Sequence, residues 1–77
     1  MTLSAEVYPN PTHDKLFIKA SESVNTIEIF SMTGTLVERH ACWSDYMEID
    51  VQNLSPGMYI IRLVGNHVVE TKRFVKE

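Results

Sequence analysis

The sequence predicts a small all-β domain built from antiparallel strands. Val, Ile and Thr, whose branched Cβ atoms pack well on a pleated sheet, provide 20 of the 77 residues. Turn-forming residues recur at roughly 8- to 12-residue intervals, and apolar and polar residues alternate between them. A chain of this length forms one module with a small core, and an apolar fraction of 44% is too high for a disordered protein.

Four turn signals divide the chain into strands. The segment Pro9-Asn10-Pro11 lacks two backbone donors, so we expect an exposed bend there. Thr33-Gly34 suits a hairpin in which the glycine takes a positive φ. Ser55-Pro56-Gly57 matches a type II turn, and Gly65-Asn66 suits a two-residue hairpin.

The segments between these turns predict about seven short strands. They comprise residues 5–8, 15–20, 27–30, 36–41, 47–51, 58–64 and 68–75. The segment 58–64 is apolar at nearly every position except Arg62, which is typical of a central strand, and we place Tyr59, Ile61 and Leu63 in the core. Seven strands at this spacing favour an immunoglobulin-like β-sandwich.

One stretch allows a second interpretation. Leu36, His40, Trp43 and Met47 fall at i, i+4, i+7 and i+11, which would place them on one face of a helix. The alternation that begins at Met47 instead favours two strands separated by a loop at residues 42–46. We adopt the strands and keep the helix as the alternative.

Charge and composition exclude several classes of function. The net charge of −3 provides no basic face for phosphates, so we expect no nucleic-acid partner. No apolar run approaches the roughly 20 residues of a membrane span. The segment Met1–Glu6 has no basic region followed by an apolar stretch, so it is not a secretory signal peptide. The single cysteine, Cys42, excludes an internal disulfide.

No arrangement of residues in the sequence indicates catalysis. His13, His40 and His67 have no partner at a metal-ligand spacing. Cys42 near His40 is interpreted as a semi-buried thiol, and Ser44-Asp45 lacks the glycines of a nucleophile elbow. We therefore expect no enzyme, no catalytic residue, no cofactor and no metal.

Three aromatic residues offer an alternative function. Trp43, Tyr46 and Tyr59 could stack on sugars, as in an adhesion or carbohydrate-binding accessory module. With only 9% aromatic residues, however, a small core needs most of them, so we expect these rings mainly in the core.

The C-terminal segment Thr71–Glu77 mixes basic and apolar residues and has two interpretations. It is either an edge strand that lysines keep soluble, or a short signal that a receptor reads. Composition alone does not separate them.

The order of all these motifs is more specific than any one of them. It runs Val7-Tyr8-Pro9-Asn10-Pro11, Leu16-Phe17-Ile18, Ile27-Glu28-Ile29-Phe30, Gly34-Thr35-Leu36-Val37, Ile49-Asp50-Val51, Leu54-Ser55-Pro56-Gly57-Met58-Tyr59 and Thr71-Lys72-Arg73-Phe74-Val75-Lys76. This order resembles the type A C-terminal sorting domain of type IX secretion system cargo, the Por secretion system tail domain of Bacteroidetes. The resemblance extends from Val7 to Lys76.

The resemblance implies a function in protein transport. Such domains end larger secreted proteins, are recognised by an outer-membrane translocon, and are commonly removed by a sortase-like peptidase before the cargo is attached to the cell surface. We expect residues 1–77 to be a single sorting domain separated from an upstream cargo domain. The cargo would be secreted or held at the cell surface after passing the periplasm. A dimer formed through an edge strand remains an alternative that the sequence does not decide.

Carried over by position, the resemblance assigns two sets of residues. The family motif comprises Tyr8, Pro9, Asn10, Pro11, Gly34, Pro56, Gly57 and Tyr59, and the segment for translocon recognition comprises Lys72, Arg73, Phe74, Val75 and Lys76. An alternating strand at a chain end could add to a receptor sheet, its main chain giving affinity and its side chains specificity.

Overall fold

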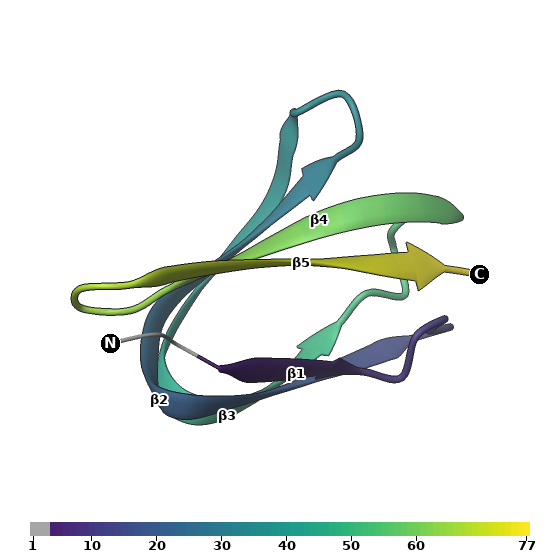
Figure 1. The fold of residues 1–77 in the computed structure, drawn as a ribbon. Helices are drawn as coiled ribbons and strands as arrows, with labels where there is room; N and C mark the ends of the chain where they lie inside the picture. The colour runs from purple at the N-terminus through teal and green to yellow at the C-terminus, as the bar shows by residue number, and fades with distance from the viewer. Residues whose placement is uncertain (1–3) are drawn as a thin grey trace.

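The computed structural model describes residues 4–77, and these form five antiparallel strands (Figure 1). The strands are β1 (Ala5–Tyr8), β2 (Lys15–Ser31), β3 (Leu36–Asp50), β4 (Gly57–Val64) and β5 (Val69–Lys76). Part of the segment Met1–Glu6 lies outside the described residues. Within residues 4–77 no helix could cross a membrane. The predicted all-β, sandwich-like fold is confirmed, and the alternative helix around Trp43 is a strand.

The predicted seven strands become five because two of them are long and bent. A straight strand of the 17 residues of β2 would measure about 56 Å at about 3.3 Å per residue, whereas the longest extent of the molecule is 33 Å. The pairing of β2 with β3 shifts register between Lys19 and Thr26, where bulges bend both strands. Residues 42–46, predicted as a loop, belong to this bend within β3, and Trp43 there has φ 56°.

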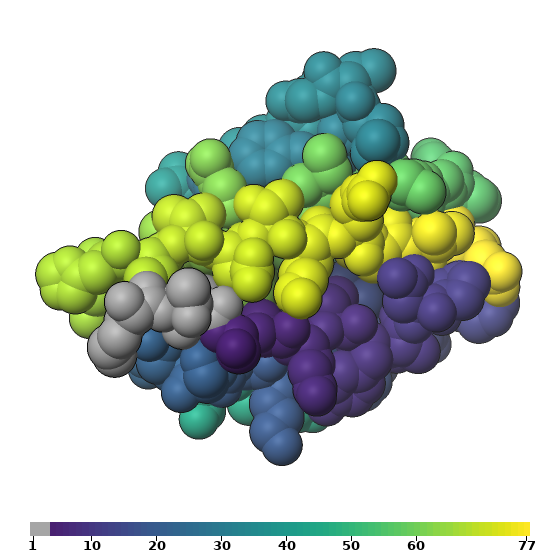
Figure 2. All heavy atoms as spheres, viewed as in Figure 1, coloured from purple at the N-terminus to yellow at the C-terminus, as the bar shows by residue number. Residues whose placement is uncertain are grey.

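Bending gives the domain two layers that share β2 and β3. The lower layer in Figure 1 contains β1 and the ends of β2 and β3 that pair through residues 15–19 and 46–50. The upper layer contains the other halves of these strands with β4 and β5. β4 lies between β2 and β5, which confirms the predicted central strand. β1 and β5 are edge strands, and they lie near each other on the face shown in Figure 2.

The turns agree with the sequence in kind and differ in detail. Gly34 has φ 90° in the predicted hairpin, a conformation that glycine adopts without strain. The last hairpin closes with the bond from Gly65 N–H to Val68 C=O (2.8 Å), so its loop residues are Asn66 and His67 and not Gly65 and Asn66. Before β4, the hydrogen-bonded turn joins Leu54 N–H to Val51 C=O (3.0 Å).

The predicted type II turn at Ser55-Pro56-Gly57 is not formed. Gly57 has φ 151°, far from the value near +80° of that turn type, and it is already the first residue of β4. The carbonyl of Ser55 instead accepts a hydrogen bond from the Tyr59 hydroxyl (2.6 Å). This side-chain contact supports the segment in place of a backbone turn.

The core lies between the two layers and is mainly aliphatic. Its buried members are Leu16, Ile18, Val24, Ile27, Ile29, Ile49, Val51, Tyr59, Ile61, Leu63 and Phe74. Tyr59, Ile61 and Leu63 are buried as predicted, because alternate residues of β4 face the lower layer. Burying such side chains from water is the main favourable term in folding.

A row of charges crosses the opposite face of the upper layer. Glu28 lies directly opposite Arg39 of β3 and Arg62 of β4. Glu28 Oε1 accepts a hydrogen bond from Arg62 Nε (2.8 Å) and forms an ion pair with Arg62 Nη2 (2.6 Å), and Oε2 lies 3.8 Å from Arg39 Nε. The Glu28 side chain is only 11% exposed, so the two guanidinium groups, and not water, are the main polar partners of its carboxylate.

We expect the substitution Glu28→Gln to lower the free energy of unfolding by about 2 kcal/mol, because it leaves two facing guanidinium groups without their counter-ion. Urea unfolding followed by circular dichroism measures the change. The control Glu48→Gln breaks the ion pair between Glu48 and Lys15. Both of these side chains are 48% exposed, so water replaces the pair and the free energy of unfolding should change much less. Equal effects of the two substitutions would contradict this role of Glu28.

Candidate functional site

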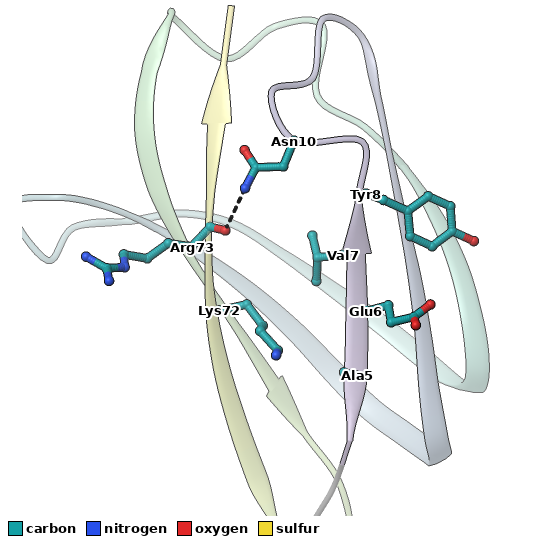
Figure 3. A pocket seen from close by; sticks show the side chains of 7 residues that line it. All are labelled: Ala5, Glu6, Val7, Tyr8, Asn10, Lys72 and Arg73. Carbon is teal, nitrogen blue, oxygen red and sulfur yellow. Dashed lines mark hydrogen bonds between the residues drawn. The ribbon is translucent and has the colours of Figure 1, made fainter.

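The segment after β1 closes onto the last strand through one side chain. Asn10 Oδ1 accepts a hydrogen bond from Val75 N–H (2.9 Å), and Asn10 Nδ2 donates to Arg73 C=O (3.4 Å; Figure 3). A side-chain amide has the donor and acceptor of a peptide group. Pro9 and Pro11 on either side have no N–H to donate. Asn10 therefore pairs with the edge of β5 as a residue of a neighbouring strand would.

Thr12 continues this contact with its main chain. Its N–H donates to Val75 C=O, its C=O accepts from Glu77 N–H (both 2.8 Å), and it pairs with Lys76 as a parallel bridge. Thr12 is fully buried, and its hydroxyl donates to the carbonyl of Lys15. The carboxyl end of β5 is thus hydrogen-bonded on both edges, to β4 and to residues 10–12.

Two of the five residues assigned to recognition lie inside the domain. Phe74 is fully buried and stacks on Tyr59, with ring centroids 5.5 Å apart. Lys76 is 6% exposed, and its Nζ donates to the carbonyls of Leu54 (2.9 Å) and Gln52 (3.5 Å). Alternation along β5 explains both positions, because residues two apart face the same side of a strand. Of the remaining three, Arg73 is exposed, whereas Lys72 and Val75 are half-buried.

A groove separates β1 from β5 beside the Asn10 contact. Its volume is about 540 Å³, and its lining comes from Ala5, Glu6, Val7, Tyr8, Asn10, Lys72 and Arg73. In Figure 3 the Lys72 side chain extends from β5 toward β1, while that of Arg73 points away from the groove. The site therefore combines part of the first motif with part of the terminal segment, which are more than 60 residues apart in the sequence.

A known protein family covers nearly the whole of this chain. Residues 6–77 match the family described as the secretion system C-terminal sorting domain. The chain belongs to this family. It is also 37% identical over 76 residues to an ulvan lyase from Nonlabens ulvanivorans, and the match covers 94% of the chain and 14% of the lyase. The chain thus spans about one seventh of that relative's length. Domains of this family are the sorting signal of the type IX secretion system, which exports proteins across the outer membrane.

Residues that the sequence analysis assigned to the family motif serve two different structural roles. Gly34 forms the β2–β3 hairpin, where its N–H donates to Ser31 C=O (2.9 Å), at the end of the molecule away from the groove (Figure 1). Tyr59 joins the segment before β4 to the last strand, through its hydroxyl bond to Ser55 and its stacking on Phe74. Asn10 and Tyr59 therefore hold β5 from two sides.

Sequence reasoning named Asn10 as a motif residue but did not identify its partner, and it did not single out Thr12. An asparagine between two prolines is a usable signal, because Asn10 supplies all the donors of that segment, one from its main chain and the others from its side-chain amide. The sequence does not say which strand that is.

The prediction that the aromatic rings mainly fill the core is wrong for two of them. Tyr59 is buried, but Trp43 is 71% exposed and Tyr46 50% exposed. Tyr46 stacks on Phe17 (6.5 Å between ring centroids), and Phe17 stacks on Tyr8 (5.7 Å). The core is instead filled by aliphatic side chains, which leaves an aromatic row across the outer face of the lower layer.

Cys42 and two of the three histidines, His13 and His40, have local partners. His40 Nε2 lies 2.8 Å from Glu38 Oε1, and Cys42 Sγ donates to Ser44 C=O (3.6 Å). His13 Nε2 lies 3.4 Å from Glu77 at the surface. Among the described residues no group of three His, Cys, Asp or Glu side chains is placed to hold a metal ion.

We expect Asn10→Ala to speed hydrogen exchange at the Val75 amide about tenfold or more, because one hydrogen bond of about 1.4 kcal/mol corresponds to that factor. Amide exchange followed by NMR measures it. Asn10→Asp keeps the acceptor and should preserve most of the protection at Val75, while Asn53→Ala in an exposed turn should leave it unchanged. Unchanged exchange in Asn10→Ala would contradict the role of the amide.

Proposed function

We propose that this sorting domain directs an attached upstream protein to the outer-membrane translocon, and that the translocon recognises a folded surface and not an extended tail. That surface lies where residues 8–11 meet residues 72–75. The observation that carries the proposal is the pairing of Asn10 with Arg73 and Val75, which joins the first motif to the terminal segment.

Burial supports this choice of surface. Phe74 and Lys76 are internal, so direct contact with a receptor falls to Lys72, Arg73 and Val75, and Arg73 is the most accessible of these. Addition of the chain end to a receptor sheet would first require Asn10 and Thr12 to leave the edge of β5, because their bonds already occupy Val75. Recognition of the folded surface avoids that loss.

The later steps follow from the same proposal. The cargo passes the periplasm before export, and a sortase-like peptidase then removes the domain and allows attachment of the cargo to the cell surface. Phe74 and Lys76 act here through the fold, because their loss would release β5 from the core and from the turn carbonyls of Gln52 and Leu54.

We expect Arg73→Glu to reduce secretion of a reporter fused upstream of the domain about tenfold in the native host, with little change in melting temperature. The substitution reverses an exposed charge and leaves the core intact. Secretion is measured as reporter in the medium relative to cells. Lys19→Glu, an equivalent charge reversal on β2, is the control and should be secreted normally.

Deletion of residues 73–77 should abolish secretion, since it removes both the surface and the core contact of Phe74. Normal secretion of that deletion would refute the proposal. Normal secretion of Arg73→Glu together with loss in the deletion would show that the translocon requires the fold but does not contact Arg73.

One observation favours a second candidate function, carbohydrate binding. The exposed row of Tyr8, Phe17 and Tyr46 resembles the aromatic surfaces that stack on sugar rings, and Lys15 and Lys19 lie on neighbouring positions of the same face. Trp43, by contrast, is in no ring stack within residues 4–77. A polysaccharide partner would use the row and not Trp43.

If this second function holds, the domain should be retarded in affinity electrophoresis through a gel that contains ulvan, the polysaccharide in the name of the lyase relative. Tyr46→Ala should remove most of the retardation, because one stacking face is lost. Trp43→Ala is the matched control with an exposed ring outside the row. Equal migration of the wild type with and without ulvan would exclude binding of this polysaccharide.

A further inference from the structure

The groove between β1 and β5 is bounded on the β1 side by the unpaired edge of that strand. Just before β1, Ser21 N–H donates to Ser4 C=O (2.8 Å) in the same register as the β1–β2 pairing. The N–H and C=O groups of the even-numbered residues of β1 therefore point toward β2. Because this direction alternates along an antiparallel strand, the N–H and C=O groups of Ala5 and Val7 face the groove. Neither residue has a backbone partner on that side within residues 4–77.

The opposite side of the groove is the edge of β5. Arg73 C=O and both main-chain groups of Val75 bond to residues 10–12, so odd-numbered residues of β5 face away from β4. By the same alternation, the groups of Val69 and Thr71 and the N–H of Arg73 also face this edge. Thr71 N–H bonds to the carboxylate of Glu70 (3.0 Å), so an acidic oxygen already occupies the position of a partner strand's carbonyl.

A guest strand between the two edges requires β1 and β5 to move apart. β1 and β5 run in the same direction in Figure 3, and their Cα atoms approach within 8 Å. Paired strands are about 4.8 Å apart, so a strand that pairs with both edges needs about 9.6 Å between them. β1 and β5 do not pair with each other, and within the ladders β1 is bound to β2 alone, so moving β1 away from β5 breaks no ladder bond between them.

Charge determines which kind of strand fits. Lys72 points across the groove toward β1, is half-buried, and forms no ion pair with any of residues 4–77. A half-buried ammonium group is stabilised most by a carboxylate, which supplies a charge-assisted hydrogen bond. A guest strand with acidic residues at alternate positions would present one face of carboxylates to this side chain.

We propose that this groove is a binding site for an extended acidic segment of a partner protein, which inserts between β1 and β5 as an added strand. Its main chain pairs with Ala5 and Val7 on one side and with the Thr71 C=O and the Arg73 N–H on the other, and a carboxylate pairs with Lys72. Main-chain bonds supply affinity in this mode of recognition, and the Lys72 pair supplies selectivity. The site does not require the translocon to be the partner, and its test does not use secretion.

The test uses a seven-residue peptide, blocked at both ends, in which Glu alternates with Val and Thr. Titration into the 15N-labelled domain should shift the amide signals of Ala5, Val7, Thr71 and Arg73. Lys72→Gln should weaken binding about tenfold, which is the loss expected for one charge-assisted bond. Lys19→Gln, a basic residue of β2 outside the groove, is the matched control and should bind as the wild type does.

Three results of this titration would overturn the inference. They are no shift at these amides with millimolar peptide, equal binding of a peptide in which Lys replaces every Glu, and equal affinity of Lys72→Gln and wild type. A second copy of this chain is the competing occupant, and sedimentation velocity tests it. Dimerisation that rises with concentration and is lost in Val7→Pro, which removes one groove-facing N–H, would assign the groove to self-association and overturn the acidic partner.

Discussion

Closure of this small sandwich depends on a side-chain amide that takes the place of a peptide group. The two layers share the bent strands β2 and β3, but β1 and β5 do not pair, so the fold would be open along one seam. Asn10 bridges the seam by bonding to Arg73 and Val75, and Thr12 extends the bridge with its main chain. The flanking prolines add no competing donors and favour an extended segment. The first and last described segments are therefore held together without a disulfide.

This arrangement places contacts that stabilise the domain and the proposed recognition surface on the same strand. The inward side chains of β5, Phe74 and Lys76, join the core and the turn before β4, while Arg73 on the other face reaches solvent. Asn10 reaches β5 only when the two layers are closed. A receptor that contacts this face would therefore bind the folded domain and not the unfolded chain. Near Lys72, the same edge of β5 has main-chain groups that bond to neither β4 nor Asn10. The groove lies along this part of the edge.

The distribution of aromatic rings follows from the shallow core. Two thin layers that share their strands enclose mainly Ile, Leu and Val, whose side chains interdigitate at a separation of about 10 Å. Of the aromatic residues within positions 4–77, only Tyr59 and Phe74 are buried among them. The stack of Tyr8, Phe17 and Tyr46 is left on the outer face, where its rings cover one another in part. Assigning aromatic residues to the core by hydrophobicity alone fails for such a small domain.

Alternation and turn chemistry, both local properties of the sequence, determined the strand class, the central strand β4, its buried residues and the Gly34 hairpin. They could not determine the bends of β2 and β3, because those segments contain no Gly or Pro and the bulges arise from pairing between strands. They misplaced the last hairpin by one residue, because Gly65 bonds to Val68 across the loop and is not itself a loop residue. Only the tertiary structure decided the partner of Asn10, the burial of Lys76 and the groove beside Lys72. Each of these joins residues at least 22 positions apart, and such contacts depend on how the layers close and not on the neighbouring sequence.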